Sequence, residues 1–529
     1  MWRGLRYSRS QQDDIVSSDP RPSSPMKSTP RSILLAGCLA LVSIGTNALG
    51  EPIDLNTGNR QFALPDFGSS ADTLLSTGEE LRLGQAFMQS VRESLPIIDD
   101  PFLDDYINGL GHGLVVASGA SGRHFSFFLV DDATVNAFAG PNGYIGVYAG
   151  LVLTAATESE LAAVVAHEIA HVTQRHLMRA YEDTQKLSLP ATALMIGAAI
   201  LGAQVSGDVG AAAITGIQAA ALQRRINFTR DNEEEADRVG IAMLADAGYN
   251  PYAMPGFFER LGKATRIQDS DAPEMLRTHP VTTNRISDAL GRAQEYGVRQ
   301  RPDSLRFHLV RADLRQRSYR RPEQAIAHFR ATLREGRYAN ETAQRYGYAL
   351  ALMRGGQISA ARKEIKPLLA AHPGQAELVA LSAELARRSG NSDEALRDLR
   401  EAFALSPTSL PLRIVYAETL LDAGRPAEAL QLLEQAARGG VGSPSFYALM
   451  VRAALQAKDE AATYRYRAEE QYALGDIEAA IDQLEMAVRQ RGLSYHEASS
   501  IQARLDELKE DQEAMKDDPW NKQSRRDAN

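Results

Sequence analysis

The 529-residue sequence predicts an α+β fold, in which a mostly helical domain with a small β-sheet precedes an all-α solenoid of repeated helix pairs. Three observations predict this. Apolar side chains recur every three or four residues through 75–116, two short later runs are rich in β-forming residues, and glycines recur at intervals of 34 in the second half. One compact core seldom exceeds about 200 residues, so we expect several segments. The expected segments are a leader (1–50), the mixed helical and β domain (51–300), the solenoid of repeats (304–511) and a disordered tail (512–529).

Residues 1–50 have the composition of a targeting segment. Lys27 and Arg31 precede an apolar run, 33–44, and the small residues Ala48 and Gly50 lie before Glu51. This pattern predicts a signal peptide and a periplasmic location. Met26 is a natural start for such a signal, so residues 1–25 either lie upstream of the true start or form a disordered leader.

The only cysteine, Cys38, lies inside this apolar run, where Leu35-Ala36-Gly37-Cys38 also resembles a lipoprotein processing site. The apolar residues before it are fewer than the about 7 to 15 that normally precede cleavage, which favours an ordinary signal peptide. Cleavage after Gly50 would leave no cysteine, and this excludes disulfides, thiol catalysis and Cys metal ligands. The formal net charge of −9 argues against nucleic acid as a partner.

The first domain combines helices with short strands. We expect helical structure over 75–116 and strands over 125–130 and 144–148, the second entered through the turn residues Pro141-Asn142-Gly143. Thr157 and Glu160 have the spacing of a capping box, which predicts a helix from there to about Met178.

An uncharged stretch follows between Lys186 and Asp208, and a weakly apolar one continues to Leu222. Its length matches the about 20 residues that span a bilayer, but Ala, Gly, Ser and Thr dominate it and Pro190 interrupts it. We therefore favour a mobile helical hairpin over 187–222 that contacts a membrane peripherally or a hydrophobic substrate, with a true span as the alternative.

The second half carries an internal repeat. Gly356, Gly390 and Gly424 are 34 residues apart, and an alanine follows each five residues later. This is the tetratricopeptide period, in which glycine ends one helix and alanine permits close helix packing. Such repeats form a surface for peptide or protein partners and carry no chemistry of their own.

The pentapeptide His167-Glu168-Ile169-Ala170-His171 follows the capping box and therefore lies on a helix. Histidines four residues apart share one helical face and can bind one zinc ion per subunit through their imidazoles. Glu168 is then the general base for the attacking water.

A catalytic zinc site usually has a third protein ligand. A third histidine six residues after His171 is absent, since that position is Leu177. The alternative is a carboxylate from a second helix, and Glu233 and Asp237 share a face on a helix that ends near Gly248. Glu233 is the predicted third ligand, and Asp237 is predicted to orient a ligand imidazole.

These motifs resemble those of gluzincin peptidases of the HtpX/Oma superfamily, as does the stretch from Asn136 to Ile145. The order of signal peptide, peptidase and C-terminal repeats is similar to that of periplasmic β-barrel assembly-enhancing proteases. The resemblance implies degradation of misfolded or misassembled outer-membrane β-barrel proteins, with a possible chaperone-like role. It also implies docking of the repeats to the β-barrel assembly machinery, and an extended substrate pairing with the strand Tyr144–Tyr148.

The resemblance further implies that His279 can occupy a fourth zinc position and hold the enzyme inactive. Without it, a packed histidine before Pro280 is the simpler interpretation. His176 falls off the zinc-facing stripe and is interpreted as a structural group or as a partner of a ligand. For Arg285, surface pairing is favoured over stabilisation of an oxyanion. Two other functions stay open: a repeat-based chaperone with a latent peptidase site, and a narrow peptidase without a role in assembly.

Overall fold

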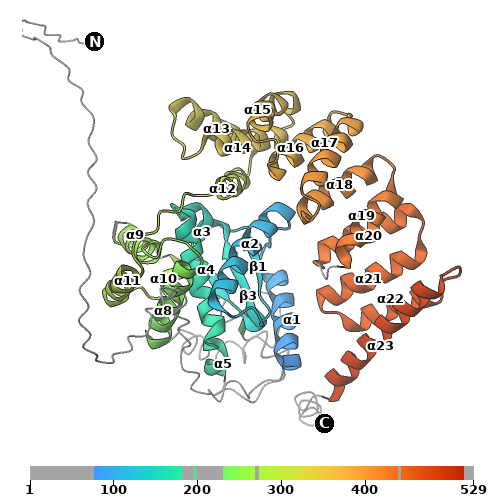
Figure 1. Cartoon of the computed structure of the whole chain (residues 1–529), viewed down its shortest axis with the longest axis horizontal. Coiled ribbons are helices and arrows are strands. Elements are labelled where there is room, and N and C mark those ends of the chain that lie inside the picture. Colours follow the sequence, from blue (N-terminus) through green and yellow to red (C-terminus); the bar gives the residue numbers. More distant parts are fainter. Residues whose placement is uncertain (1–76, 182–195, 198–229, 268–272, 439–441, 518–529) are drawn as a thin grey trace, which may run out of the picture. The chain divides into compact units, whose positions relative to one another are not determined.

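The computed structural model describes residues 77–181, 196–197, 230–267, 273–438 and 442–517, all of which belong to one compact unit. The predicted fold class is confirmed: a small sheet lies among helices, and a long series of helix pairs follows (Figure 1). The predicted signal peptide lies outside the described residues, and so does nearly all of the segment 187–222. No helix in the described ranges is both long and apolar enough to cross a bilayer.

The predicted helical region divides into α1 (Thr77–Ser94) and α2 (Pro101–Ser118). Pro96 lies between them, and Asp100 caps α2 by accepting hydrogen bonds from the backbone N–H groups of Phe102 and Leu103. Because the cap begins a new helix, the chain can change direction here.

Three strands form the sheet: β1 (Ser126–Val130), β2 (Ala137–Ala139) and β3 (Tyr144–Tyr148). The order is β1-β3-β2, with β1 parallel and β2 antiparallel to β3. The two predicted strands are present, whereas β2 was not predicted because three residues carry little periodic signal. Both edges of β3 are paired, so the expectation that a substrate adds to Tyr144–Tyr148 is wrong.

The turn before β3 is the short helix η2 (Pro141–Gly143). Gly143 has φ 71°, and a Cβ there would lie 2.0 Å from the carbonyl oxygen of His124. Only glycine fits this close approach. The turn therefore sets the position at which β3 enters the sheet.

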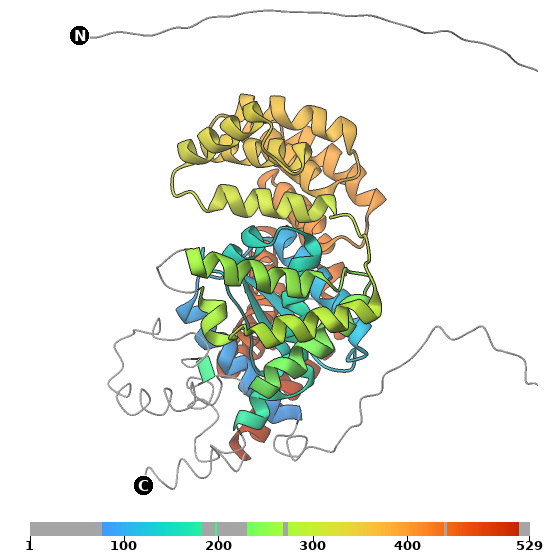
Figure 2. The same cartoon turned by 90° about the vertical axis from the view of Figure 1, so that its left-hand side faces the viewer.

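The central helix of the domain is α4 (Glu158–Thr173), which contacts β2 and β3 on one side and α8 and α9 on another (Figures 1 and 2). It ends five residues before the predicted end at Met178, because Arg175 adopts a left-handed φ of 55° and a separate short helix begins at His176. The remaining helices of this part are α3 (Ala149–Thr154), α5 (His176–Tyr181), α8 (Arg230–Asp246), α9 (Ala253–Ile267), α10 (Glu274–Thr278) and α11 (Thr283–Tyr296).

The repeats begin with α12 (Leu305–Arg317), whose Phe307, Val310 and Leu314 are buried in the same core as α2, α4 and the sheet. The helices that follow pack mainly on their neighbours in sequence. They are α13 (Pro322–Glu335), α14 (Glu341–Arg354), α15 (Ile358–Ala371), α16 (Ala376–Arg388), α17 (Ser392–Leu405), α18 (Leu410–Asp422), α19 (Pro426–Ala437), α20 (Pro444–Ala457), α21 (Glu460–Leu474), α22 (Ile477–Val488) and α23 (Tyr495–Asp517).

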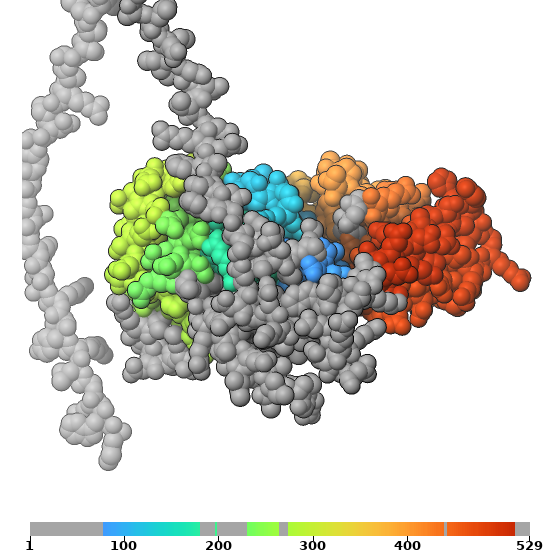
Figure 3. Space-filling model, turned by 90° about the horizontal axis from the view of Figure 1, so that it is seen from below, coloured from blue at the N-terminus to red at the C-terminus, as the bar shows by residue number. Residues whose placement is uncertain are grey.

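The last helices form a continuous surface, red in the space-filling view (Figure 3). The prediction of a disordered tail from 512 is wrong at its start, because α23 extends to Asp517. Leu505 and Leu508 anchor this helix in the core that α21 and α22 share. Residues 518–529 lie outside the described part of the chain.

Candidate metal centre

Helix α4 carries the two histidines of the predicted site. Thr157 caps it by accepting a hydrogen bond from the N–H of Glu160, as the sequence predicts. His167 and His171, one turn apart, present their Nε2 atoms 3.0 Å from each other. Both side chains are buried, so they face the interior of the domain rather than solvent.

Helix α8 crosses α4 at this point and supplies the carboxylates. A Cβ on Gly240 of α8 would lie 3.3 Å from the backbone nitrogen of His167, so the small residue allows the two helices to approach closely. Glu233 and Asp237 are both buried, with about 1% of each residue exposed. The prediction that they share one helical face towards the histidines agrees with the structure.

Four side chains converge at the centre: His167, His171, Glu233 and His279 each offer one ligand atom, all within 4.8 Å of one another. The carboxylate of Glu233 lies 3.5 Å from Nε2 of His167 and 3.4 Å from Nε2 of His171. His279 Nδ1 lies 2.8 Å from Glu233 Oε1 and 3.4 Å from His167 Nε2.

These spacings suit a tetrahedral metal ion. Four ligand atoms at the bond lengths of zinc lie about 3.3 Å from one another at the corners of a tetrahedron. Five contacts among these side chains, which include both carboxylate oxygens of Glu233, measure 2.8 to 3.5 Å and bracket this value. The mixed nitrogen and oxygen donors also match those that zinc takes in proteins.

Asp237 lies behind the ligands. Its Oδ1 is 2.9 Å from Nδ1 of His167, so this imidazole donates to Asp237 and leaves Nε2 free to face the centre. Asp237 therefore lies within contact distance of the imidazole that it is predicted to orient.

Arg285 was predicted to be a surface residue, and this is wrong. Only 1% of it is exposed, and its guanidinium donates two hydrogen bonds to Asp237, at 2.7 and 2.8 Å. A third contact, 2.7 Å long, joins Nη1 to Glu233, and the group also lies over the ring of Phe258. Because Arg285 pairs with both carboxylates, it neutralises charge that burial would otherwise penalise.

His176 contacts the site more directly than the sequence indicated. Its Nδ1 lies 2.8 Å from Nδ1 of His171, and its Nε2 lies 3.0 Å from Glu235. If Nε2 of His171 faces the metal, its Nδ1–H donates to His176, which in turn donates through Nε2–H to Glu235. The left-handed turn at Arg175 brings His176 back to its partner, a detail that helical periodicity does not contain.

Glu168 lies beside the four potential ligands and is almost fully buried. Its carboxylate accepts a backbone hydrogen bond from Ala139 of β2, and its Oε1 lies 3.6 Å from Nε2 of His279. Burial raises the pKa of this carboxyl group. Oε1 has no hydrogen-bond donor among the described residues, so it can accept a proton from a molecule in the site.

The protonation preferences of the cluster follow from its charges. Burial opposes protonation of His167, but hydrogen bonds to Asp237 and Glu233 outweigh it and raise its pKa to about 10. Burial lowers the pKa of His171 well below its usual value. A divalent cation would favour neutral imidazoles and ionised carboxylates throughout, since metal binding displaces protons from its ligands.

Access to the centre is narrow. A cavity of about 20 Å³ reaches His171 between η2, β2 and the end of α4, with Glu80 and Arg175 among its lining residues. This volume holds about one water molecule. Among the described residues, this cavity by itself is too small to hold a polypeptide.

Comparison with known proteins agrees with this geometry. The model of peptidase family M48 matches residues 101–293, and a tetratricopeptide repeat model matches residues 386–453. The β-barrel assembly-enhancing protease of Escherichia coli (strain K12) is 35% identical over 486 residues, which cover 91% of this chain and 97% of that protein. The chain belongs to peptidase family M48. The expectation of a metallopeptidase followed by tetratricopeptide repeats is confirmed.

Two further relatives of this M48 peptidase differ in how much of the chain they match. The β-barrel assembly-enhancing protease of Yersinia pestis is 34% identical and covers 85% of this chain and 92% of its own length. The mitochondrial metalloendopeptidase OMA1 of Arabidopsis thaliana is 28% identical over 184 residues, 35% of each chain. The first match is long enough to include repeats, whereas the second is about as long as the peptidase part alone.

Proposed function

We propose that this M48 peptidase is a zinc-dependent endopeptidase, with His167, His171 and Glu233 as metal ligands and Glu168 as general base. The observation that carries the proposal is the convergence of four buried side chains whose potential ligand atoms lie within 4.8 Å of one another, with the buried carboxylate of Glu168 beside them. When bound, zinc would polarise the scissile carbonyl and a water molecule.

The side chains around the metal position divide the remaining work. Glu168 accepts the proton of the attacking water and passes it to the leaving amine. Asp237 holds the tautomer of His167 that presents Nε2, and Arg285 keeps Asp237 ionised and in place.

The substrate backbone pairs with the outer edge of β2 rather than with β3. In the described sheet, β2 is an edge strand, and β3 is covered on both sides. The N–H of Ala139 already faces Glu168, so a strand added along Ala137–Ala139 would pass the catalytic carboxylate. Backbone pairing reads little side-chain sequence, which suits an enzyme that selects unfolded chains.

His279 restrains the enzyme by occupying the fourth metal position. Its Nδ1 already lies at ligand spacing from His167 and Glu233, and it follows the five-residue helix α10 directly. Catalytic zinc keeps one position for water, so His279 must leave before hydrolysis can begin.

The cellular role we propose is degradation of misfolded or misassembled outer-membrane β-barrel proteins in the periplasm, with the repeats binding the assembly machinery. The support is the name of relatives that match almost the whole chain, "Beta-barrel assembly-enhancing protease". The alternative is a repeat-based chaperone with a latent peptidase site, which the closed metal position favours.

The Glu168→Gln variant tests the peptidase function. We expect it to lose hydrolysis of an unfolded protein such as reduced casein while keeping one zinc per chain, because the amide cannot accept the proton and Glu168 is not a ligand. Full hydrolysis by this variant would refute the assignment. Equal support of β-barrel assembly in cells by wild type and variant would favour the chaperone alternative.

Partner binding by the repeats needs a deletion that spares the peptidase core. Since α12 is part of that core, the deletion should begin after Arg321 rather than at residue 304. We expect the shortened chain to keep its zinc and to lose co-purification with outer-membrane assembly proteins. Unchanged co-purification would assign the contact to the peptidase part.

A further inference from the structure

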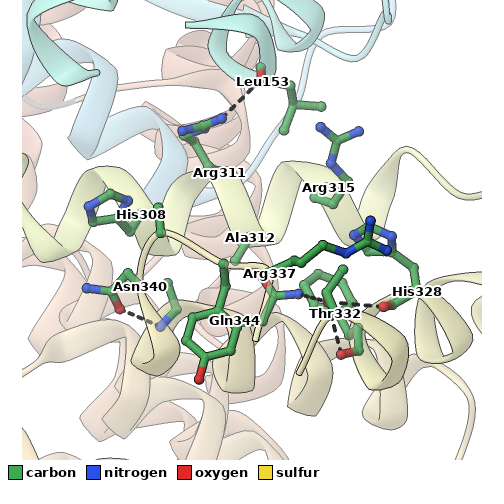
Figure 4. Close-up of a pocket in the computed structure, with 14 residues that line it drawn as sticks. Leu153, His308, Arg311, Ala312, Arg315, His328, Thr332, Arg337, Asn340 and Gln344 are labelled. Carbon is green, nitrogen blue, oxygen red and sulfur yellow. Dashed lines mark hydrogen bonds between the residues drawn. The ribbon is translucent and has the colours of Figure 1, made fainter. Parts of the chain in front are cut away.

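A second pocket lies outside the metal centre, where α12, α13, α14 and the end of α3 meet (Figure 4). Its volume is about 440 Å³, which falls in the range of sites that hold ligands of many atoms. Leu153, the residue of α3 that lines it, lies five positions after the end of β3. The pocket is therefore built jointly by the peptidase core and the first repeats.

The lining of this pocket is basic. Five basic side chains face it, and no aspartate or glutamate lines it; the five are His308, Arg311, Arg315, His328 and Arg337. Two carboxylates lie near its margin: Asp303 is 3.9 Å from Nε2 of His308, and Glu335 pairs with Arg337. Among the described residues, the lining of the pocket therefore carries an excess of positive charge.

Arg311 and Arg315 carry this charge from successive turns of α12. Arg311 donates to the carbonyl oxygen of Leu153 at 3.1 Å, and Arg315 forms no ion pair within the described ranges (Figure 4). Burial and then the neighbouring Arg315 lower the pKa of both Arg311 and His328. Cationic side chains that lower one another's pKa in this way are stabilised by a bound anion.

Other lining groups suit a polypeptide. Asn340 uses its oxygen to cap α14 by accepting from the N–H of Ala343, which leaves its NH₂ group as a donor. Gln344 and Tyr338 add polar groups, while Leu153 and Phe329 add apolar surface. An inorganic anion would use the guanidinium groups alone, whereas a peptide would also use this mixed lining.

We propose that the pocket binds an acidic segment of an extended polypeptide, with aspartate or glutamate side chains paired to Arg311 and Arg315. Arginine guanidinium groups bind carboxylates through paired hydrogen bonds, and pairs partly removed from water are stronger than surface pairs. None of the residues that line this pocket is a potential ligand of the metal centre.

The test is fluorescence anisotropy with a labelled peptide of alternating Asp and Glu and a matched peptide of Asn and Gln. Full-length Glu168→Gln protein is used so that neither peptide is cleaved. We expect the acidic peptide to bind at least tenfold more tightly, with an affinity that falls as salt rises from about 0.05 to about 0.5 M.

Arg315→Gln should weaken binding of the acidic peptide roughly tenfold, the effect of losing one charge-assisted hydrogen bond. Arg320→Gln is the matched control, because Arg320 is exposed and does not line the pocket. Arg337→Gln, at the exposed rim, provides a second variant if the first unfolds.

Equal affinity for the two peptides, or equal losses in Arg315→Gln and Arg320→Gln, would overturn the proposal. Titration with inorganic phosphate at matched ionic strength tests whether the pocket instead binds a small inorganic anion. Phosphate binding as tight as that of the acidic peptide would also overturn it, since the pocket would then be a small-anion site.

Discussion

Replacing Arg285 with methionine tests whether the buried charges of the metal centre depend on one another. The guanidinium makes three contacts of 2.7 to 2.8 Å with Asp237 and Glu233, and both carboxylates are buried. Removing one partner of a buried ion pair costs about 3 to 5 kcal/mol, since the remaining charge has no compensation. For a domain of this size that corresponds to a fall in Tm of roughly 6 to 20 °C.

The effect should depend on zinc. A bound divalent cation replaces part of the lost positive charge, directly at Glu233 and through His167 at Asp237. We therefore expect Arg285→Met to show the full fall in Tm in EDTA and about half of that fall with saturating zinc, measured by calorimetry. Arg285→Lys should lower Tm less than Arg285→Met, since lysine keeps the positive charge but lacks the planar guanidinium group.

Arg292→Met is the matched control on the same helix, α11. Arg292 forms an exposed pair with Asp288 four residues away, which is worth less than about 1 kcal/mol. A fall in Tm for Arg285→Met no larger than that of this control, or an equal fall with and without zinc, would refute the reasoning.

Three further predictions concern two histidines of the metal centre and one buried carboxyl group outside it. His279→Ala should raise hydrolysis of casein at saturating zinc, because it frees the fourth metal position; unchanged or lower activity would contradict the restraint. His176→Leu should raise the zinc dissociation constant roughly 10 to 100-fold in a chelator competition, because His171 loses its partner, and His176→Gln should recover part of the affinity. Burial and the neighbouring Asp99 and Asp100 raise the pKa of Asp104 to about 7. Between about pH 4 and pH 7 the folded state therefore keeps a proton on Asp104 that the unfolded state has lost. The free energy of unfolding falls as the pH rises through this range. Asp104→Asn should therefore stabilise the protein by roughly 1 to 3 kcal/mol at pH 8 and leave it unchanged at pH 3, and an equal gain at both would contradict this.

The sequence predicted most of the candidate metal centre because its signals are local. Two histidines four residues apart and a capping box place His167 and His171 on one helical face wherever the helix lies. The assignment of Glu233 and Asp237 to the same site as the histidines rested on a second helical motif and on a resemblance. In the structure, the packing of α8 on α4 brings these four side chains together.

Predictions failed where contacts join residues distant in sequence. Arg285 has the local pattern of a surface residue, but packing of α11 on α8 buries it against Asp237. Residues 144–148 were recognised as a strand, but their place in the centre of the sheet depends on β2, whose three residues are too few for periodicity to predict.

The sequence by itself determined the class of this protein: a helical metallopeptidase with a HExxH helix, followed by repeats of 34 residues, because period and capping are properties of neighbouring residues. The tertiary structure alone decided that β3 lies in the centre of the sheet with β2 at one edge, and it brought His279, which the resemblance had suggested, to 3.4 Å from His167. It also decided that arginines of α12 line a pocket against α3. These depend on how separate helices and strands pack, and no local pattern encodes that packing.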